Sequence, residues 1–358
     1  MKRNAKTGGL FAMSILSGAV LLASPASANM TLAVTYDFAS DPGISGPQEQ
    51  QVETAFNAVA AQFDNAIANP ITVNVQVSVG SINGSNIPLP AGNVSGDFTT
   101  NVQMGTTAAA SFANTVAALA NTGAVLPTTD PTGGNHFFYI PQAEFKALGL
   151  PATNPAALLA FDGYIGFSSN LSQFSFSGTP GALQYSFQAS AEHEIMEVLG
   201  RISSLNNGGA DANLVAFPLD LLRYSSPGVN SFDENATAYA SADGGVNDLG
   251  TFNSDPANTL DRSDWATPNN STSTDEQNDQ FHTGVIEGPS ISDEDVLQAL
   301  GYTIAPSNGN GLFNGANAPI GATPGVNAVP EPGTLSLLAA VPGLIALLRR
   351  RAQRPTAD

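Results

Sequence analysis

The sequence contains no cysteine, so disulfide bonds are excluded, although an exported chain could use them. The stability of the fold must therefore come from a buried core. Roughly 300 residues remain once the two ends of the chain are set aside, and this length is enough for one large domain or two small ones.

Basic residues are scarce as well. The chain has 11 Lys and Arg against 30 Asp and Glu, for a formal net charge of −19. Seven of the 11 lie near the two ends, which leaves four basic and 28 acidic residues in the body, a formal charge of −24. Such a surface repels nucleic acid and anionic membranes, so a nucleic-acid partner is not expected. It is consistent with a secreted soluble protein, and it also suits the binding of divalent cations.

Long apolar runs are scarce too, and the first of the two lies near the N-terminus. Basic residues precede an apolar stretch at positions 10–23, and an A-x-A sequence ends at Ala28. This order predicts a secretory signal peptide over residues 1–28. The alternative, a first transmembrane helix, is disfavoured by the short apolar stretch.

The second apolar run lies at the C-terminus. Residues 329–358 contain a Val-Pro-Glu-Pro sequence, an apolar segment at 334–348 and three consecutive arginines at 349–351. As a helix, the segment would span about 22 Å, short for a hydrocarbon core of about 30 Å. The three parts resemble, in order, the PEP-CTERM sorting tail of Gram-negative bacteria, attached here through a Gly/Asn/Pro/Ala-rich linker at 305–328.

This resemblance implies a route for the protein. The chain would be exported, held transiently in the inner membrane through its C-terminal span and released to the cell surface or extracellular matrix by a dedicated sorting enzyme. A permanent tail anchor is the alternative.

The body of the chain, residues 29–304, shows alternating strand and helix patterns, which predict an α+β fold in one domain. Apolar periodicity predicts a strand, a helix and a second strand that form a βαβ unit, followed by a second helix and a short strand. A glycine-bearing strand is expected at a sheet edge, and a last helix is expected to begin after an N-cap at Ser292. The corresponding residues are 31–38, 46–67, 71–80, 105–121, 135–141, 157–169 and 290–304.

The strongest chemical signal is "ASAEHEIMEVLGRISSL" at 189–205. On a helix, His193 and Glu197 share one face, and both side chains can bind Zn²⁺. Glu194 lies beside them, where a carboxylate can act as general base on water activated by the metal. The alternative is a solvated helix, but such a run of glutamates would then normally pair with Lys or Arg, and only Arg201 is near.

The segment "HEIMEVLGR" resembles the H-E-I-x-E-V-M-G-R signature of a PEP-CTERM-associated metalloprotease family, and it is similar to the zincin helix of metzincins. Further segments, among them "DGYIGFSS", "LDLLRYSSPG" and "SDW", follow in the order that such proteins show. The resemblance implies a zincin-like metallopeptidase domain with a mixed twisted sheet and an active-site helix, and an exported zinc-dependent endopeptidase that cleaves protein or peptide substrates. The sequence departs from the metzincin pattern at Glu197 and at Ser203, where histidines are expected.

A third zinc ligand must therefore come from elsewhere. Asp220 is the first candidate, and Tyr224 would be a catalytic residue if Leu222–Tyr224 is the counterpart of the metzincin turn beneath the metal. A capped turn with a core tyrosine is the alternative for this pair. His282 is the other candidate ligand, although a solvated loop histidine is the more ordinary interpretation.

Two further hypotheses stay open. The chain could be a catalytically inactive surface or matrix protein, possible calcium binding aside, whose zincin fold has lost its zinc. Alternatively, the acidic loops could be primary, and the chain would then be a calcium-dependent adhesion module. The acidic loops at 233–248 and 253–265 lack the regular spacing of calcium loops, which favours solvated loops over calcium sites.

Overall fold

The computed structural model describes most of the body of the chain. The described residues are 29–39, 43–83, 87–89, 94–151, 158–205, 214–255, 261–266, 274–304 and 328–330. The predicted signal peptide and nearly all of the predicted linker and sorting tail lie outside these ranges. Within them, no helix has both the length and the apolar character needed to cross a membrane.

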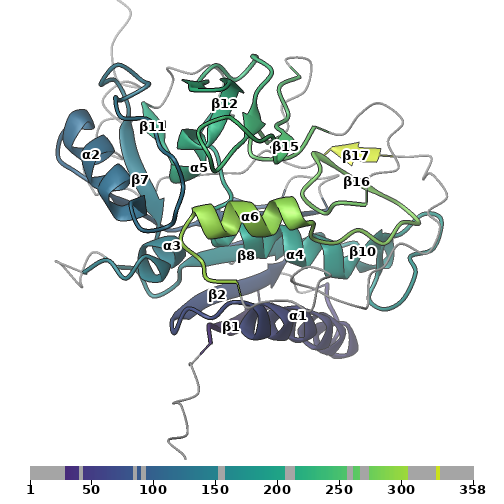
Figure 1. Ribbon diagram of the computed structural model, residues 1–358. Coiled ribbons are helices and arrows are strands. Elements are labelled where there is room, and N and C mark those ends of the chain that lie inside the picture. Colours follow the sequence, from purple (N-terminus) through teal and green to yellow (C-terminus); the bar gives the residue numbers. More distant parts are fainter. Residues whose placement is uncertain are drawn as a thin grey trace, which may run out of the picture.

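The main sheet has four strands in the order β1, β2, β8, β5. β1 (Thr31–Asp37), β2 (Thr72–Val79) and β8 (Gly163–Phe167) run parallel, and β5 (Ser95–Thr99) pairs antiparallel with β8 at the edge. Helix α1 (Gly46–Ala66) connects β1 to β2, which confirms the predicted strand–helix–strand unit. The fold therefore mixes helices with parallel and antiparallel strands, which is compatible with the predicted α+β class (Figure 1).

The remaining elements surround this sheet. A second sheet has the order β11, β7, β6, and a third has the order β13, β12, β14, β15. The strand pairs β3 with β4, β9 with β10, and β16 with β17 are short. Their bounds, with those of the helices, are β3 Ser81–Ile82, β4 Ile87–Pro88, β6 Asn101–Gln103, α2 Ala108–Leu119, β7 Phe137–Pro141, α3 Gln142–Ala147, η3 Leu171–Gln173, β9 Phe174–Ser175, β10 Tyr185–Ser186, α4 Phe187–Val198, β11 Val215–Ala216, α5 Pro218–Leu221, β12 Arg223–Ser226, β13 Val229–Asn230, β14 Tyr239–Ala240, β15 Gly250–Thr251, β16 Gln280–His282, α6 Ile291–Ala299 and β17 Ala328–Pro330.

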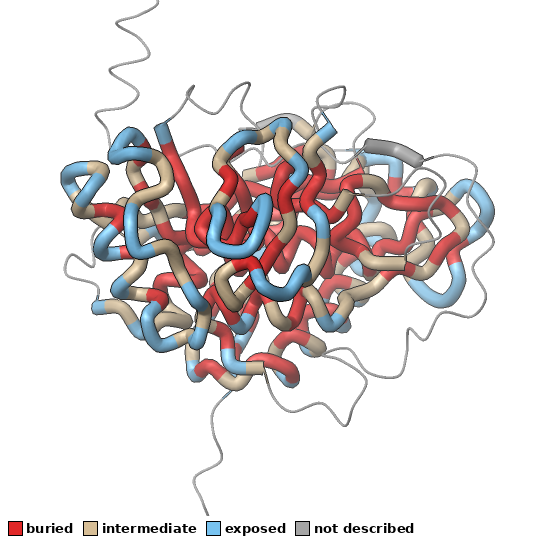
Figure 2. The backbone as a smooth tube through the Cα atoms, turned by 45° about the horizontal axis from the view of Figure 1, so that its top comes forward, coloured by how far each residue is buried: buried red, intermediate tan, exposed pale blue. Residues whose placement is uncertain are grey.

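One core joins the main sheet to the helices. Val52, Phe56 and Phe63 on one face of α1 are buried, as their helical spacing predicts. Residues of β2, α4 and α6 belong to the same apolar cluster, and α1 contacts α4 directly. Buried backbone runs through the middle of the molecule, and exposed residues gather at loop tips (Figure 2). Helix α4 is therefore an interior helix.

The prediction that the glycine-bearing strand lies at a sheet edge is wrong. β8 is an inner strand between β2 and β5. Its glycines serve close packing instead, because a Cβ at Gly163 would overlap the side chain of Val198 in α4, and one at Gly166 would overlap the carbonyl oxygen of Ser81. Gly163 thus lets α4 lie directly against the sheet.

We expect Gly163→Ala to lower the free energy of unfolding by about 1–3 kcal/mol, the range typical of overpacking a filled core. Urea unfolding measures this change. The cost should shrink in a Val198→Ala background, because that substitution removes the methyl groups that the new Cβ would meet. An unchanged unfolding midpoint in Gly163→Ala would show that α4 does not press on β8 at this point.

The last helix of the body begins two residues earlier than predicted. The N-cap of α6 is Ser290 rather than Ser292, and its hydroxyl accepts a hydrogen bond from the backbone N–H of Asp293. The Asp293 carboxylate in turn accepts from the backbone N–H of Ser290 at 2.8 Å. This reciprocal pair, with Asp at the third helical position, fixes the start of the helix. The predicted stop at Gly301 is confirmed by its positive φ of 104°.

Candidate metal centre

Helix α4 carries the His-Glu motif and is held at both ends. The Ser186 hydroxyl accepts a hydrogen bond from the Ala189 N–H at the start. At the end, Gly200 adopts a φ of 119°, and the N–H groups of Gly200 and Arg201 donate to the carbonyls of Glu197 and Met196. This is a Schellman termination, which needs a left-handed residue at the glycine position. The helix therefore stops directly after the turn that carries His193 and Glu197, and Arg201 enters the interior.

His193 is oriented by a backbone carbonyl. Its Nδ1 lies 2.7 Å from the carbonyl oxygen of Glu276, which can only accept, so Nδ1 carries the proton and Nε2 keeps its lone pair. Burial, assisted by the charge of Arg201, lowers the pKa of His193 to about 3. The imidazole is thus neutral at neutral pH, the form that binds a metal, and its second nitrogen is held as in metal sites generally.

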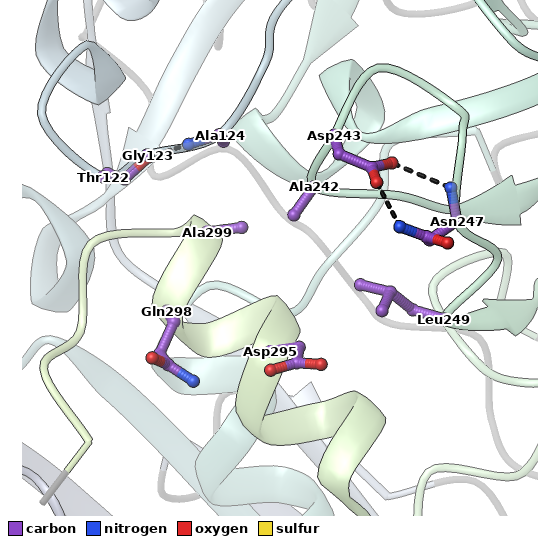
Figure 3. A pocket seen from close by; sticks show the side chains of 10 residues that line it. All are labelled: Thr122, Gly123, Ala124, Ala242, Asp243, Asn247, Leu249, Asp295, Gln298 and Ala299. Carbon is purple, nitrogen blue, oxygen red and sulfur yellow. Dashed lines mark hydrogen bonds between the residues drawn. The ribbon is translucent and has the colours of Figure 1, made fainter.

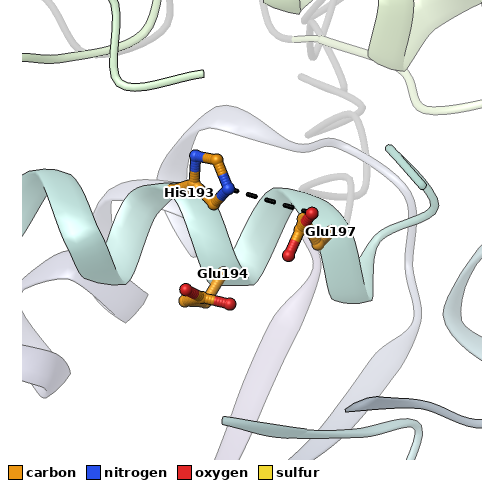
Figure 4. A group of neighbouring side chains, drawn as sticks. All are labelled: His193, Glu194 and Glu197. Atoms are coloured by element: carbon orange, nitrogen blue, oxygen red, sulfur yellow. Dashed lines mark ion pairs between the residues drawn. The ribbon is translucent and has the colours of Figure 1, made fainter. Parts of the chain in front are cut away.

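Two carboxylates converge on the Nε2 side of this ring. Glu197 Oε1 lies 3.8 Å from His193 Nε2, one helical turn along α4 (Figure 4). Asp264 Oδ1 lies 3.9 Å from the same nitrogen, although it comes from a different part of the chain. Donors bound to zinc at about 2.0–2.2 Å cannot be more than about 4.4 Å apart, so both distances fit ligands of one ion. The Nε2 side of His193 is therefore lined by two carboxylates, each close enough to share an ion with this nitrogen.

Arg201, just beyond the end of α4, fixes the position of the segment that carries Asp264. Arg201 donates from Nη1 to the carbonyl oxygen of Ser263 at 3.0 Å, and its guanidinium lies 4.2 Å from the centre of the Trp265 ring. Trp265 is anchored further, since its indole N–H donates to Asp293 Oδ1 at 2.9 Å. The segment Ser263–Trp265 is thus fixed to the end of the motif helix.

Glu194 completes the group. Its carboxylate lies with the imidazole of His193 and the carboxylate of Glu197 in a set whose potential ligand atoms are all within 4.8 Å of one another (Figure 4). Burial and the neighbouring Asp97 raise the pKa of Glu194 well above its usual value. Both of its oxygens are buried without a hydrogen-bond partner among the described residues, an arrangement that leaves them available to accept a proton.

More acid surrounds the motif than a three-ligand site needs. We call the five carboxylates that lie together here the acid cluster. Its members are Asp97, Glu194, Glu197, Asp261 and Asp264. Each is at most 3 % exposed. Asp97 reaches the cluster from β5, the edge strand that packs against α4.

The structure places the other predicted site residues elsewhere. Asp220 caps helix α5, where its carboxylate accepts from the Phe217 N–H at 2.8 Å and from the Ser203 hydroxyl at 2.6 Å. The Tyr224 hydroxyl donates to the carbonyl oxygen of Val125 at 2.9 Å. Neither residue joins a potential ligand group among the described residues. The capped turn with a core tyrosine, the alternative interpretation from the sequence, describes both.

His282 also lies apart from the group. It belongs to β16 and is buried, and its Nδ1 lies 2.9 Å from Glu287 Oε1. This hydrogen bond raises the pKa of His282. It is therefore an ion-pair partner of Glu287 and not the solvated loop histidine expected.

Sequence reasoning missed Asp264, Asp261 and Asp97. The first two belong to the acidic loop at 253–265, which was expected to be solvated, yet they are 0 % and 1 % exposed. One signal was present, because a lone tryptophan directly after Asp264 indicates that this stretch turns into the core. The segment around Asp97, Ser-Gly-Asp-Phe-Thr, has no alternating apolar pattern that would have marked it as a buried strand.

A pocket of about 300 Å³ lies away from this centre (Figure 3). None of the candidate ligands lines it. Its walls come from the end of α6, the loop after α2 and the β14–β15 connection, through Thr122, Gly123, Ala124, Ala242, Asp243, Asn247, Leu249, Asp295, Gln298 and Ala299. The Asp243 carboxylate is bound by Asn247 of the same loop, so it is committed to loop structure.

The burial of these acids predicts how the stability of the metal-free protein depends on pH. Burial raises the pKa of Asp97 from 3.8 to about 8 and that of Glu192 from 4.5 to about 8. The folded state thus keeps protons that the unfolded chain releases above about pH 4, and stability should fall as pH rises from about 4 to about 8. We expect the melting temperature without metal to be several degrees lower near pH 8 than near pH 5.

Calorimetry with and without Zn²⁺ checks this prediction. Because a metal competes with protons for the carboxylates, added zinc should raise the melting temperature more near pH 8 than near pH 5. A metal-free protein that becomes more stable over this range would contradict the assigned burial of the acids.

No model of a protein family matches this chain, and neither does any curated protein or any solved structure.

Proposed function

We propose that the protein is a zinc-dependent endopeptidase whose metal is held by His193, Glu197 and Asp264, with Glu194 as general base. The observation that carries the proposal is the convergence of Asp264 on the neutral Nε2 of His193, 3.9 Å away, beside Glu197. Asp264 takes the place that the sequence had suggested for Asp220.

The residues present fit a zinc ion. They offer one imidazole nitrogen and two carboxylate oxygens, all donors that zinc accepts. Both oxygens of Asp264 are buried without a hydrogen-bond partner among the described residues, which is costly for a carboxylate unless a cation compensates it. Bound there, Zn²⁺ would polarise a peptide carbonyl and acidify water.

The protein's own groups supply the remaining chemistry. Glu194 accepts a proton from the attacking water and passes it to the leaving amine, as its raised pKa favours. The Glu276 carbonyl keeps His193 in the ligand tautomer. Arg201 holds the segment that carries Asp264 in register with α4. Two carboxylate ligands make the ion less Lewis-acidic than three histidines would, so slow turnover is expected.

A zincin-like fold is part of this proposal. The mixed sheet, with the antiparallel edge strand β5 packed against the motif helix, supports it. From the sequence we further propose export through residues 1–28, transient anchoring through the C-terminal span, processing by a sorting enzyme and release to the surface or matrix of a Gram-negative cell.

A second candidate is a surface or matrix protein in which the cation has a purely structural role. Burial favours it, because His193, Glu197 and Asp264 are each at most 3 % exposed. A fully enclosed ion without an open position stabilises a fold and does not catalyse.

Metal analysis and proteolysis of the purified protein separate the two. The peptidase predicts near-stoichiometric zinc and slow cleavage of an unstructured substrate such as casein, which chelation abolishes and added Zn²⁺ restores. Bound zinc with no cleavage would support the structural role. Absence of zinc at neutral pH with micromolar metal present would refute the zinc site itself.

A further inference from the structure

The acid cluster holds more negative charge than one zinc ion neutralises. Its five carboxylates would carry five negative charges if ionised, while His193 is neutral. One divalent ion leaves about three of these charges uncompensated in the interior, where isolated ionised groups are strongly disfavoured. The charge of Arg201 acts on Asp264, but Arg201 is already paired with Asp293, with Nη2 and Oδ1 3.3 Å apart.

The geometry divides the cluster into two neighbouring groups. His193, Glu194 and Glu197 form one set, and Glu197, Asp261 and Asp264 form another; the potential ligand atoms within each set lie within 4.8 Å of one another. Glu197 belongs to both. The second set offers only oxygen donors, and oxygen ligands at about 2.3–2.6 Å from a calcium-sized ion can be nearly 5 Å apart across it.

An independent observation points into the second group. Asp97 is 1 % exposed, and both of its carboxylate oxygens are buried without a hydrogen-bond partner among the described residues. It reaches from β5 to a position next to Glu197 and Asp261. Ser95, two residues earlier on the same face of the strand, lies next to Glu194 of the first group instead. Asp97 thus brings a fourth buried carboxylate to the second group.

We propose that a second divalent cation of the oxygen-preferring class, Ca²⁺, Mg²⁺ or Mn²⁺, binds between Glu197, Asp261, Asp264 and Asp97, beside the zinc position. A ligand set made only of carboxylate oxygens, with no nitrogen or sulfur donor, favours this class of cation. Two divalent ions reduce the formal charge of the cluster to minus one. Glu197 and Asp264 would be ligands of both cations, so this proposal rests on the proposed zinc site. It does not depend on peptidase activity.

The test is a cation titration of the purified full chain, first equilibrated with one equivalent of Zn²⁺. Calorimetric titration with Ca²⁺, and Mn²⁺ titration followed by electron paramagnetic resonance, should each show one further ion per chain. Asp261→Asn should keep the zinc and weaken binding of the second ion at least tenfold. Asp248→Asn, an equal charge change at an exposed position, is the matched control and should bind both ions like the parent.

Other variants keep the outcome decisive. Should Asp261→Asn fail to fold, Asp97→Asn replaces it with the same expectation. His193→Ala should lose zinc and still bind Ca²⁺ or Mn²⁺, which would support the second site even where the zinc site fails. Zinc bound with no further Ca²⁺ or Mn²⁺ in the parent chain overturns the proposal and leaves the zinc site standing. In that case, protons shared between the carboxylates would neutralise the cluster. Asp261→Asn would then leave the stability of the fold unchanged or raise it.

Discussion

Replacing Glu194 by glutamine should leave zinc bound and abolish measurable peptide hydrolysis. The substitution keeps the size of the side chain but removes its ability to accept a proton, and loss of a general base typically costs about 10²–10⁴-fold in rate. Zinc content should be unchanged, because the proposed ligands are His193, Glu197 and Asp264. Zinc analysis beside casein cleavage measures both effects in one preparation.

Glu192→Gln is the matched control for this experiment. Glu192 lies on the same helix and is equally buried, but its Oε1 accepts from the Gln188 side chain at 2.8 Å and it joins no potential ligand group among the described residues. This variant should cleave casein like the parent. Equal activity of Glu194→Gln and the parent would remove Glu194 from the mechanism, and loss of zinc in Glu194→Gln would make it a ligand.

Asp264→Asn should have the second large effect, on zinc affinity. Removing a negative ligand should weaken binding by more than the roughly 10–100-fold seen when a residue that only supports a ligand is changed. The fold should persist, because the packing of Trp265 and the contact of Arg201 with the Ser263 carbonyl do not involve the Asp264 side chain. Competition with a chromophoric chelator measures the affinity, and circular dichroism checks the fold.

Asp220→Asn provides the contrast. It should lower stability, because the carboxylate that accepts from Phe217 N–H and Ser203 Oγ is lost, but it should bind zinc like the parent. The opposite pattern, with zinc lost in Asp220→Asn and kept in Asp264→Asn, would restore the ligand set suggested by the sequence and reject the one proposed from the structure.

The sequence by itself determined the local features of this protein. Apolar spacing located α1 and β2 almost to the residue, because a helix and a strand each repeat their faces over a few positions. The same reasoning placed His193 and Glu197 together, since residues four apart share a helix face.

Tertiary structure alone decided the rest of the centre. Asp97 comes from an edge strand, and Asp261 and Asp264 come from a loop far along the chain from α4. No periodicity relates these positions, because their approach depends on how the sheet is ordered and on the contacts of Arg201 with Ser263 and Trp265. Asp220 was the nearer candidate in sequence, but its carboxylate is used by the turn that it caps. Local spacing could identify the helix that carries the proposed metal ligands His193 and Glu197, whereas the proposed third ligand and the surplus of acid depend on packing between distant segments.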